Sequence, residues 1–364
     1  MKKIYISTIA AALLTTSAMA ESTTFKDAMS KGTVSGDISV FNTSVSNSGT
    51  TADSGYSMSS IGLGYATKSY KGLTGAIAMR TNHMISEKAT GDYSNGTDPE
   101  VALSTLNISY STDKATIVAG RQEIDLEWIG DYHEAVVGVL KYVPDTTIIV
   151  GHTERKMAVD ADAALEKMAD IGTKSNGASV IDVKYEGIKG TTINPYFMNS
   201  SDLFSAYGVK VTSEVAGVGV TGHYAATSED VAGVKDGSIM HLEVSKEISG
   251  LTLTAGYITN DKDGGNGSLD ALGDNISPFE DGGNAYGADA DSYYLSVGAE
   301  VSAVTLGAFY GSSSYANSTD SEIVLTAGTA IASDLALDLL YSTTSYETST
   351  SDTDKLNLTL TYSF

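Results

Sequence analysis

The feature that most constrains this chain is an alternation of apolar and polar side chains, which recurs in segments of about ten residues from Gly32 onward. The final segment is the clearest: from Lys355 to Phe364 every even position is apolar and every odd position is polar. The same alternation occupies 251–257 and 335–341. Successive side chains of a strand point to opposite faces, so each segment predicts a strand with one apolar and one polar face.

Segments of this kind, read between turn signals, predict about 18 strands, with 16 as the alternative count. The expected strands span 32–41, 56–70, 72–84, 101–111, 114–121, 134–143, 145–154, 177–187, 190–200, 203–213, 216–226, 237–247, 250–260, 292–301, 303–313, 320–331, 333–345 and 353–364. Tight turns such as 112–113 and 249–250 alternate with long connections such as 85–100 and 155–176. Short turns at one end and long loops at the other are typical of an outer-membrane barrel, with the short turns in the periplasm and the long loops outside.

Residues 1–20 have the charged start, short apolar run and small-residue end of a secretory signal peptide. Residues 21–364 contain no apolar stretch close to the roughly 18 residues that a membrane helix needs. Within lipid only a closed sheet pairs all of its backbone groups. The prediction is therefore an exported all-β protein whose residues 21–364 form a single closed antiparallel transmembrane β-barrel in a Gram-negative outer membrane, its apolar rows facing lipid. A soluble sandwich is the alternative, and it would bury those rows between two sheets.

Charge and composition exclude several functions. The chain has 22 basic and 45 acidic residues, a formal charge of −23, and no basic block, so nucleic acid is not an expected partner. The absence of cysteine excludes thiolate metal sites and thiol catalysis. The five histidines lack metal-ligand spacing, and neither a nucleophile elbow nor a P-loop is present. The sequence therefore predicts neither an enzyme nor a cofactor.

Strand parity predicts which charged side chains face the interior of the barrel. On 181–186, Ile181, Val183 and Tyr185 alternate with three charged residues, and a Lys or Arg on the lipid side at mid-bilayer would cost about 2–4 kcal/mol. The residues predicted to face the lumen are Arg80, Lys141, Asp182, Lys184, Glu186, Lys210, His223, His241, Glu243, Glu300 and Asp338.

The connection 122–133 is predicted to fold into the lumen and to narrow it. Residues 121–134 contain seven ionisable side chains, and mixed charge around a narrow aqueous passage filters solutes by charge. The residues predicted to line this constriction are Arg121, Glu123, Asp125, Glu127 and Asp131. The alternative is a solvated surface loop.

The segment 117–125, Ile-Val-Ala-Gly-Arg-Gln-Glu-Ile-Asp, resembles the Gly-Arg-Gln-x-(Leu/Ile)-Asp segment of OprD-type porins and of the related Campylobacter-type major outer membrane porins. In those families a Thr-Pro pair follows the Asp, whereas Leu126 and Glu127 stand here. The resemblance implies an 18-strand barrel, a loop folded into the lumen after this segment, and a homotrimer. The alternating strand that ends at Phe364 is similar to the ending that the barrel-assembly machinery reads in such proteins.

Two loops carry separate predictions. The alanine-rich segment 157–171 has acid early and lysine late, which predicts a short helix. In the acidic loop 261–291, Asp261 and Asp263 resemble part of a calcium-binding loop, although the bidentate Glu of an EF-hand is missing. A flexible, solvated loop is the alternative to a calcium site.

The function predicted from these features is that of an outer-membrane porin. Small hydrophilic solutes and ions would diffuse passively through the lumen, and the acidic excess predicts a preference for cations. One alternative is a substrate-specific channel of the same fold. The other is a structural or adhesive surface protein with a plugged lumen.

Overall fold

The computed structural model describes residues 21–364 except 95, 173–175, 202, 275, 282–283, 317 and 348–351. The predicted signal peptide lies outside the described residues. Two short helices, α2 (Phe25–Ser30) and the 3-10 turn η2 (Leu269–Ala271), accompany nineteen strands in the described part. The strands are β1 (Thr33–Asn47), β2 (Ser54–Ala66), β3 (Leu73–Glu87), β4 (Val101–Ser111), β5 (Ala115–Glu123), β6 (Tyr132–Leu140), β7 (Thr146–Met157), β8 (Ala169–Asp170), β9 (Ala178–Ile188), β10 (Thr191–Ser200), β11 (Phe204–Val215), β12 (Val218–Glu229), β13 (Ser238–Ile248), β14 (Leu251–Asn260), β15 (Asp291–Val301), β16 (Val304–Tyr315), β17 (Ser318–Ala332), β18 (Leu335–Tyr346) and β19 (Thr353–Ser363).

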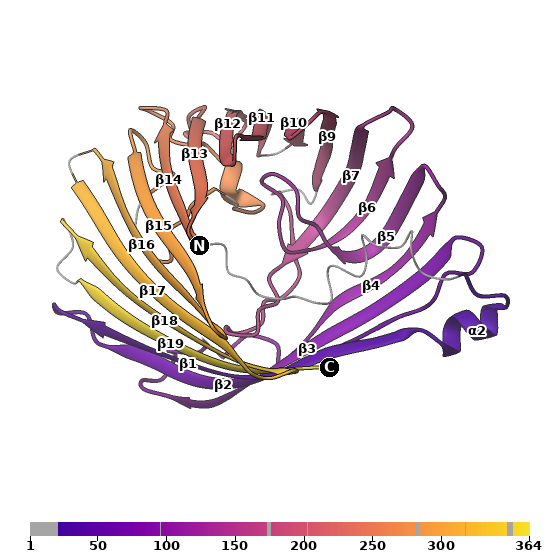
Figure 1. Ribbon diagram of the computed structural model, residues 1–364, viewed down its shortest axis with the longest axis horizontal. Coiled ribbons are helices and arrows are strands. Elements are labelled where there is room, and N and C mark those ends of the chain that lie inside the picture. The colour runs from indigo at the N-terminus through magenta and orange to yellow at the C-terminus, as the bar shows by residue number, and fades with distance from the viewer. Residues whose placement is uncertain are drawn as a thin grey trace.

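The sheet closes on itself. Each strand pairs antiparallel with its neighbour in sequence, and β1 pairs with both β2 and β19 (Figure 1). The two-residue strand β8 pairs only with β7, and β7 also pairs directly with β9, so 18 of the nineteen strands form the wall. The predicted all-β, 18-strand closed barrel is confirmed. No described helix is long and apolar enough to cross a membrane.

Strand positions agree closely with the alternation, and the exceptions have local causes. β4 occupies Val101–Ser111, as predicted. β1 runs on to Asn47 because its pairing with β19 continues to that residue. The helix predicted at 157–171 is wrong: apart from Met157, which ends β7, and the two residues of β8, this segment is irregular. Its carbonyl groups at Asp160 and Ala163 accept hydrogen bonds from Asn82 and are not used within a helix.

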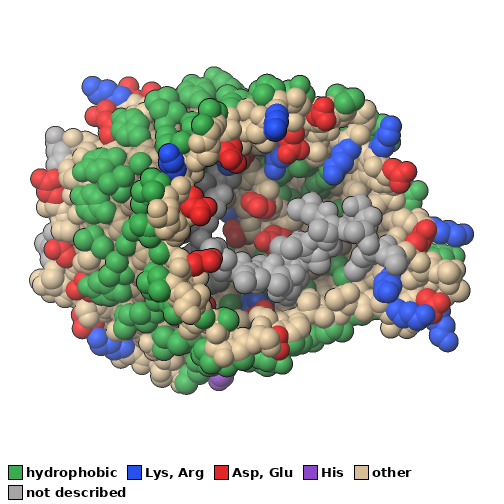
Figure 2. All heavy atoms as spheres, viewed as in Figure 1, with side chains coloured by type: hydrophobic (Ala, Val, Ile, Leu, Met, Phe, Trp, Pro, Cys, Tyr) green, Lys and Arg blue, Asp and Glu red, His purple; other side chains and the backbone are tan. Residues whose placement is uncertain are grey.

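The two faces of the wall differ as the alternation predicts. Leu356, Leu358 and Leu360 of β19 are exposed on the outside, and Leu360 is paired with Val40 of β1, which is exposed as well. The inward positions carry small or polar side chains such as the buried Ser60. Figure 2 shows the hydrophobic side chains spread over the outer wall. Exposed apolar rows around one closed sheet exclude the sandwich and match a lipid-facing belt.

The main buried apolar cluster lies inside the barrel. It includes Trp128, Ile129 and Leu269 from the loops 124–131 and 261–290, together with wall residues such as Phe204 and Ile258. Both loops therefore pack against the inward face of the wall formed by β10–β17. They fill the part of the lumen next to these strands.

Candidate solute passage

Loop 124–131 reaches the wall through one aromatic and one charged contact. Trp128, with no exposed surface, donates from Nε1 to the hydroxyl of Tyr196 on β10 at 2.8 Å. Glu127 Oε1 lies 2.8 Å from Lys210 Nζ on β11. The loop also contacts the second loop, where the N–H of Gly130 donates to the carbonyl of Leu272 at 3.1 Å. A segment that leaves β5 thus crosses to strands far along the sheet.

Tyrosine and histidine side chains line the wall below this loop. Tyr196 Oη lies 2.8 Å from His223 Nε2, and His241 Nε2 lies 2.8 Å from Tyr294 Oη. Tyr294 also donates to Glu243 at 2.6 Å. His223 and His241 are register partners on β12 and β13, so the two pairs form one polar row across the wall.

Two of these rings need glycine beside them. A Cβ at Gly208 would lie 2.1 Å from the hydroxyl of Tyr196, and one at Gly256 would lie 2.1 Å from the ring of Tyr294. The tyrosines therefore lie flat along the wall over neighbouring strands instead of projecting into the lumen.

The loop 261–290 extends farther around the barrel, to β17–β19. The N–H groups of Glu280 and Asp281 donate to the two carboxylate oxygens of Glu322 at 2.8 and 2.7 Å. Lys355 of β19 pairs with Glu280 at 3.1 Å and also with Asp281. Phe279 meets Phe309 of β16 edge to face, with ring centroids 5.7 Å apart. We call these contacts of residues 279–281 the loop latch.

A third segment, 158–168, leaves β7 and contacts the inward side of β2 and β3. Asn82 donates to the carbonyl oxygens of Asp160 at 2.8 Å and Ala163 at 2.6 Å, and Tyr56 donates to that of Asp162 at 2.7 Å. Asn82 is buried and lies on the inward face of β3. The segment therefore lies along the wall opposite the loop 124–131.

A cavity of about 410 Å³ remains between the segment 158–168, the loop latch and the strands β1, β2 and β19. Its lining residues include Phe41, Tyr56, Asp92, Asp160, Asp162, Glu280, Lys355 and Asn357. We call this cavity the aperture. Its charged lining consists of four carboxylates and one lysine, and Figure 2 shows acidic side chains around the hollow of the molecule.

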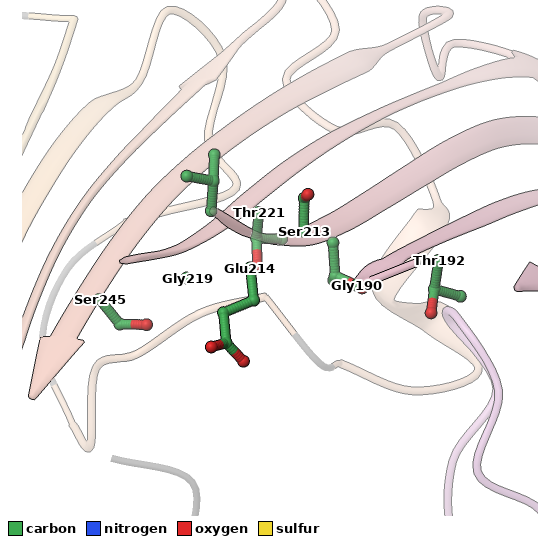
Figure 3. A pocket seen from close by; sticks show the side chains of 9 residues that line it. Gly190, Thr192, Ser213, Glu214, Gly219, Thr221 and Ser245 are labelled. Carbon is green, nitrogen blue, oxygen red and sulfur yellow. The ribbon is translucent and has the colours of Figure 1, made fainter. Parts of the chain in front are cut away.

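A second cavity, of about 270 Å³, lies near the short-turn ends of β10–β13 (Figure 3). Glu214, Thr192, Thr212, Thr221 and Ser245 are among its lining residues. Its hydroxyl groups and single carboxylate make this end of the lumen wall polar as well.

The structure separates the residues predicted to form the constriction. Glu127 reaches Lys210 on β11, while Asp125 and Asp131 are exposed in the loop and Glu123 is the half-buried last residue of β5. The prediction for Arg121 is wrong.

Arg121 lies on the lipid side of the wall. Its register partner on β4, Leu106, is 53% exposed on the outer face. The guanidinium donates to the carbonyl of Leu103 at 2.6 Å and pairs with Glu134, which also pairs with Arg155 at 3.3 Å. The partners hold the guanidinium on this face, and near the loop end of β5 the cost of an outward arginine falls to about 0–1 kcal/mol. The prediction rested on the density of ionisable residues in 121–134, which does not indicate the face of a strand.

The residues predicted to face the lumen fall into three groups. Arg80 pairs with Asp37 at 2.7 Å on the β1–β3 side. On the side formed by β9–β13 the structure brings together Asp182, Lys184, Lys210, His223, His241 and Glu243. Three of the residues are exposed near the short-turn ends of their strands: Glu186, Glu300 and Asp338. Lys141 is exposed and directly follows β6, and its N–H donates to the carbonyl of Lys114 at 2.8 Å, which extends the pairing of β5 with β6 by one bond. Its position in the lumen stays a prediction.

Several residues of the passage were missed by the sequence reasoning. Lys355 and Asp37 occupy inward positions of alternating strands, so the parity argument could have found both. Asp160, Asp162 and Glu280 lie in loops, where no periodic signal indicates the path of the chain.

The two calcium candidates are engaged within the protein. Asp261 Oδ1 accepts the N–H groups of Asp263 and Gly264, both at 2.8 Å, and these bonds, that of Gly264 first, hold the pKa of the Asp261 carboxyl below its usual value. Asp263 lies 3.2 Å from Lys235 Nζ. Among the described residues no group of three or more His, Cys, Asp or Glu side chains is placed to hold a metal ion.

Calcium binding at Asp261 and Asp263 stays a prediction with a direct test. Calorimetric titration of the purified barrel with calcium should give heat that is lost in Asp261→Asn. If titration gives no heat, the loop is not a calcium site. Because Asp261 already accepts two backbone N–H groups, any binding is expected to be weak, in the range of about 10⁻⁴–10⁻³ M.

No family model and no curated protein matches the chain. Solved structures, by contrast, do match the chain. OccAB4 of Acinetobacter baumannii superposes with a TM-score of 0.73 at 13% identity, covering 91% of this chain and 98% of its own. OpdO of Pseudomonas aeruginosa gives 0.75 at 13%, covering 92% and 97%. The outer membrane protein OpdK of the same organism gives 0.73 at 13%, covering 91% and 99%. The chain therefore has the fold of these OprD-type outer-membrane barrels over nearly its whole length.

Proposed function

We propose that this protein is an outer-membrane porin through which small hydrophilic solutes and ions diffuse passively. The observation that carries the proposal is a closed 18-strand barrel with an apolar exterior, inside which a cavity of about 410 Å³ lined by four carboxylates remains. Barrels of 16–18 strands are wide enough to leave an aqueous channel. The localisation agrees with this, since the barrels that the chain resembles include an outer membrane protein.

Charge around the aperture supports a preference for cations. Asp92, Asp160, Asp162 and Glu280 line it, and the amino group of Lys355 is paired with Glu280 and Asp281. Carboxylates that line a narrow, water-filled passage raise the local concentration of cations and lower that of anions. Salt screens these carboxylates less than it screens charge on the outer loops. They lie directly beside the passage, whereas charge beyond the Debye length of about 8 Å is largely screened.

Substitution at the aperture tests this selectivity. In Asp160→Asn/Asp162→Asn the reversal potential across a salt gradient should shift toward zero, because two of the four lining carboxylates are neutralised. The matched control is Asp113→Asn, in the exposed turn 112–114, which should leave the reversal potential unchanged. Wild-type protein with clear anion selectivity would contradict the proposed cation preference.

Two alternatives predict different recordings. A substrate-specific channel would show single-channel current blocked by its own solute at low concentration. The segment 158–168 and the loop latch, which bound the aperture together with β1, β2 and β19, give it enough defined contacts for such recognition. A surface protein with a plugged lumen would show no conductance. The large apolar cluster inside the barrel is the observation that favours this alternative. Recording from planar bilayers separates all three.

Assembly and partners remain part of the proposal. Phe364 is exposed beside β1, where its N–H donates to the carbonyl of Gly36 at 3.0 Å. An accessible terminal aromatic on the closing strand supports recognition by the barrel-assembly machinery. A homotrimer is the expected oligomer from the resemblance, and the mass of the detergent-solubilised complex tests it.

A further inference from the structure

Helix α2 lies outside the barrel wall, at the short-turn end of β2 and β3 (Figure 1). Its attachment uses backbone groups. The N–H of Lys68 donates to the carbonyl of Ala28 at 3.1 Å, and the hydroxyl of Tyr65 donates to the carbonyl of Met29. Ala28 is buried against the barrel. The helix is therefore fixed by its small residue and its carbonyl groups, and its large side chains are left outside.

Two of the exposed side chains of α2 are large and apolar. Phe25 is 63% exposed and Met29 is 48% exposed, and their i, i+4 spacing places them on one face. Phe25 meets Tyr70 edge to face, with ring centroids 6.2 Å apart. Beyond the turn that contains Tyr70, the exposed register partners Leu73 and Tyr110 begin the outer wall. The apolar face of α2 is thus continuous with the lipid-facing belt.

Lysines are concentrated around this helix. The segments 21–31 and 67–72 contain four lysines and two acidic residues, in a chain whose net charge is −23. The lysines are Lys26, Lys31, Lys68 and Lys71. Lys31 pairs with Asp27 at 3.1 Å, while Lys71 Nζ lies 5.5 Å from the centroid of the Tyr70 ring. The connections 112–114 and 333–334, at the same end of the barrel, carry no such excess, and Figure 2 shows basic side chains gathered where Figure 1 places α2.

We infer that α2 and the β2–β3 connection form an interfacial anchor that binds anionic phospholipid headgroups of the leaflet on the short-turn side. Phe25 and Met29 enter the boundary between headgroups and acyl chains, and the lysines contact the lipid phosphates. Apolar residues beside a basic cluster are the composition of interfacial helices, and basic residues near a membrane surface are attracted to anionic lipid. The inference rests on the membrane insertion in the proposed function and does not require conductance.

The absence of cysteine from the chain allows a clean depth measurement. Met29→Cys, spin-labelled in the full barrel and reconstituted into phosphatidylglycerol vesicles, should be more accessible to oxygen than to a water-soluble nickel relaxant. The control is Asp113→Cys, in an exposed turn at the same end, whose label should be accessible to the nickel relaxant. If both labels are equally accessible to the nickel relaxant, the inference is overturned. The apolar face of α2 would then be a surface for a soluble partner.

Lipid selectivity is tested with the lysines. Binding of phosphatidylglycerol to the detergent-solubilised barrel, followed by native mass spectrometry, should weaken by about fivefold or more in Lys26→Gln/Lys68→Gln/Lys71→Gln, whereas phosphatidylcholine binding stays unchanged. The control variant is Lys114→Gln/Lys189→Gln, in two other short connections. Unchanged phosphatidylglycerol binding in the triple variant overturns the inference. Single-channel conductance of the same variant reports separately on the porin proposal and should equal that of wild type.

Discussion

Replacement of Glu322 by alanine should raise single-channel conductance, roughly twofold, by releasing the loop latch. Glu322 is 1% exposed, and its carboxylate accepts the N–H groups of both Glu280 and Asp281. Without it, two backbone donors lose their acceptor inside the barrel, at a cost of about 1–3 kcal/mol each. The loop segment would then leave the wall of β17–β19, and the aperture that it bounds would widen.

Two further variants make this result specific. Glu322→Gln keeps one acceptor oxygen and should give an intermediate conductance. Glu300→Ala, an exposed carboxylate near the short-turn end of β15, should leave conductance unchanged. Faster proteolysis of the loop 261–290 in Glu322→Ala reports the release independently of current. An unchanged proteolysis pattern together with unchanged conductance would show that the latch does not position the loop.

Replacement of Trp128 by alanine should destabilise the barrel by about 3–5 kcal/mol, the usual cost of deleting a fully buried aromatic side chain. The indole belongs to the apolar cluster inside the barrel, contacts Tyr286 of the second loop with ring centroids 6.0 Å apart, and donates to Tyr196. Its loss removes one of the contacts that join the two loops to each other and to the wall. Unfolding by urea in phospholipid vesicles measures the difference.

The hydrogen bond and the packing can be separated by a second variant. Trp128→Phe retains most of the ring but removes the donor to Tyr196, so it should cost about 0.5–1.5 kcal/mol for the bond, plus a smaller packing loss. Leu126→Ala, in the same loop, serves as a packing control because Leu126 is also buried in the cluster. If Trp128→Ala unfolds at the same urea concentration as wild type, the loop is not held through this residue.

The wall of the barrel could be predicted from residue order because its signal is local. In β19, Leu356, Leu358 and Leu360 alternate with polar residues, and each strand repeats that relation with its immediate neighbours. A slip of one residue would turn the leucines to the lumen, so the alternation specifies register as well as strand position. The same reasoning identified the inward side chains His223 and His241.

The density of charge in 121–134 did not indicate the face that Arg121 occupies. Arg121 continues the outward row of Ile117 and Ala119 on β5, and its charge is neutralised by Glu134 from the next strand. That partner is not visible in a single segment.

The alternation of residue types was sufficient to specify a closed barrel surrounded by lipid, because lipid on one side and water on the other impose a period of two on every strand. The course of the three inward segments depended on contacts between residues far apart in the chain, such as Trp128 with Tyr196, Glu280 with Glu322, and Asp160 with Asn82. Hydrogen bonds of this kind follow no sequence period. For that reason the aperture and the carboxylates that line it could be identified only from the tertiary structure.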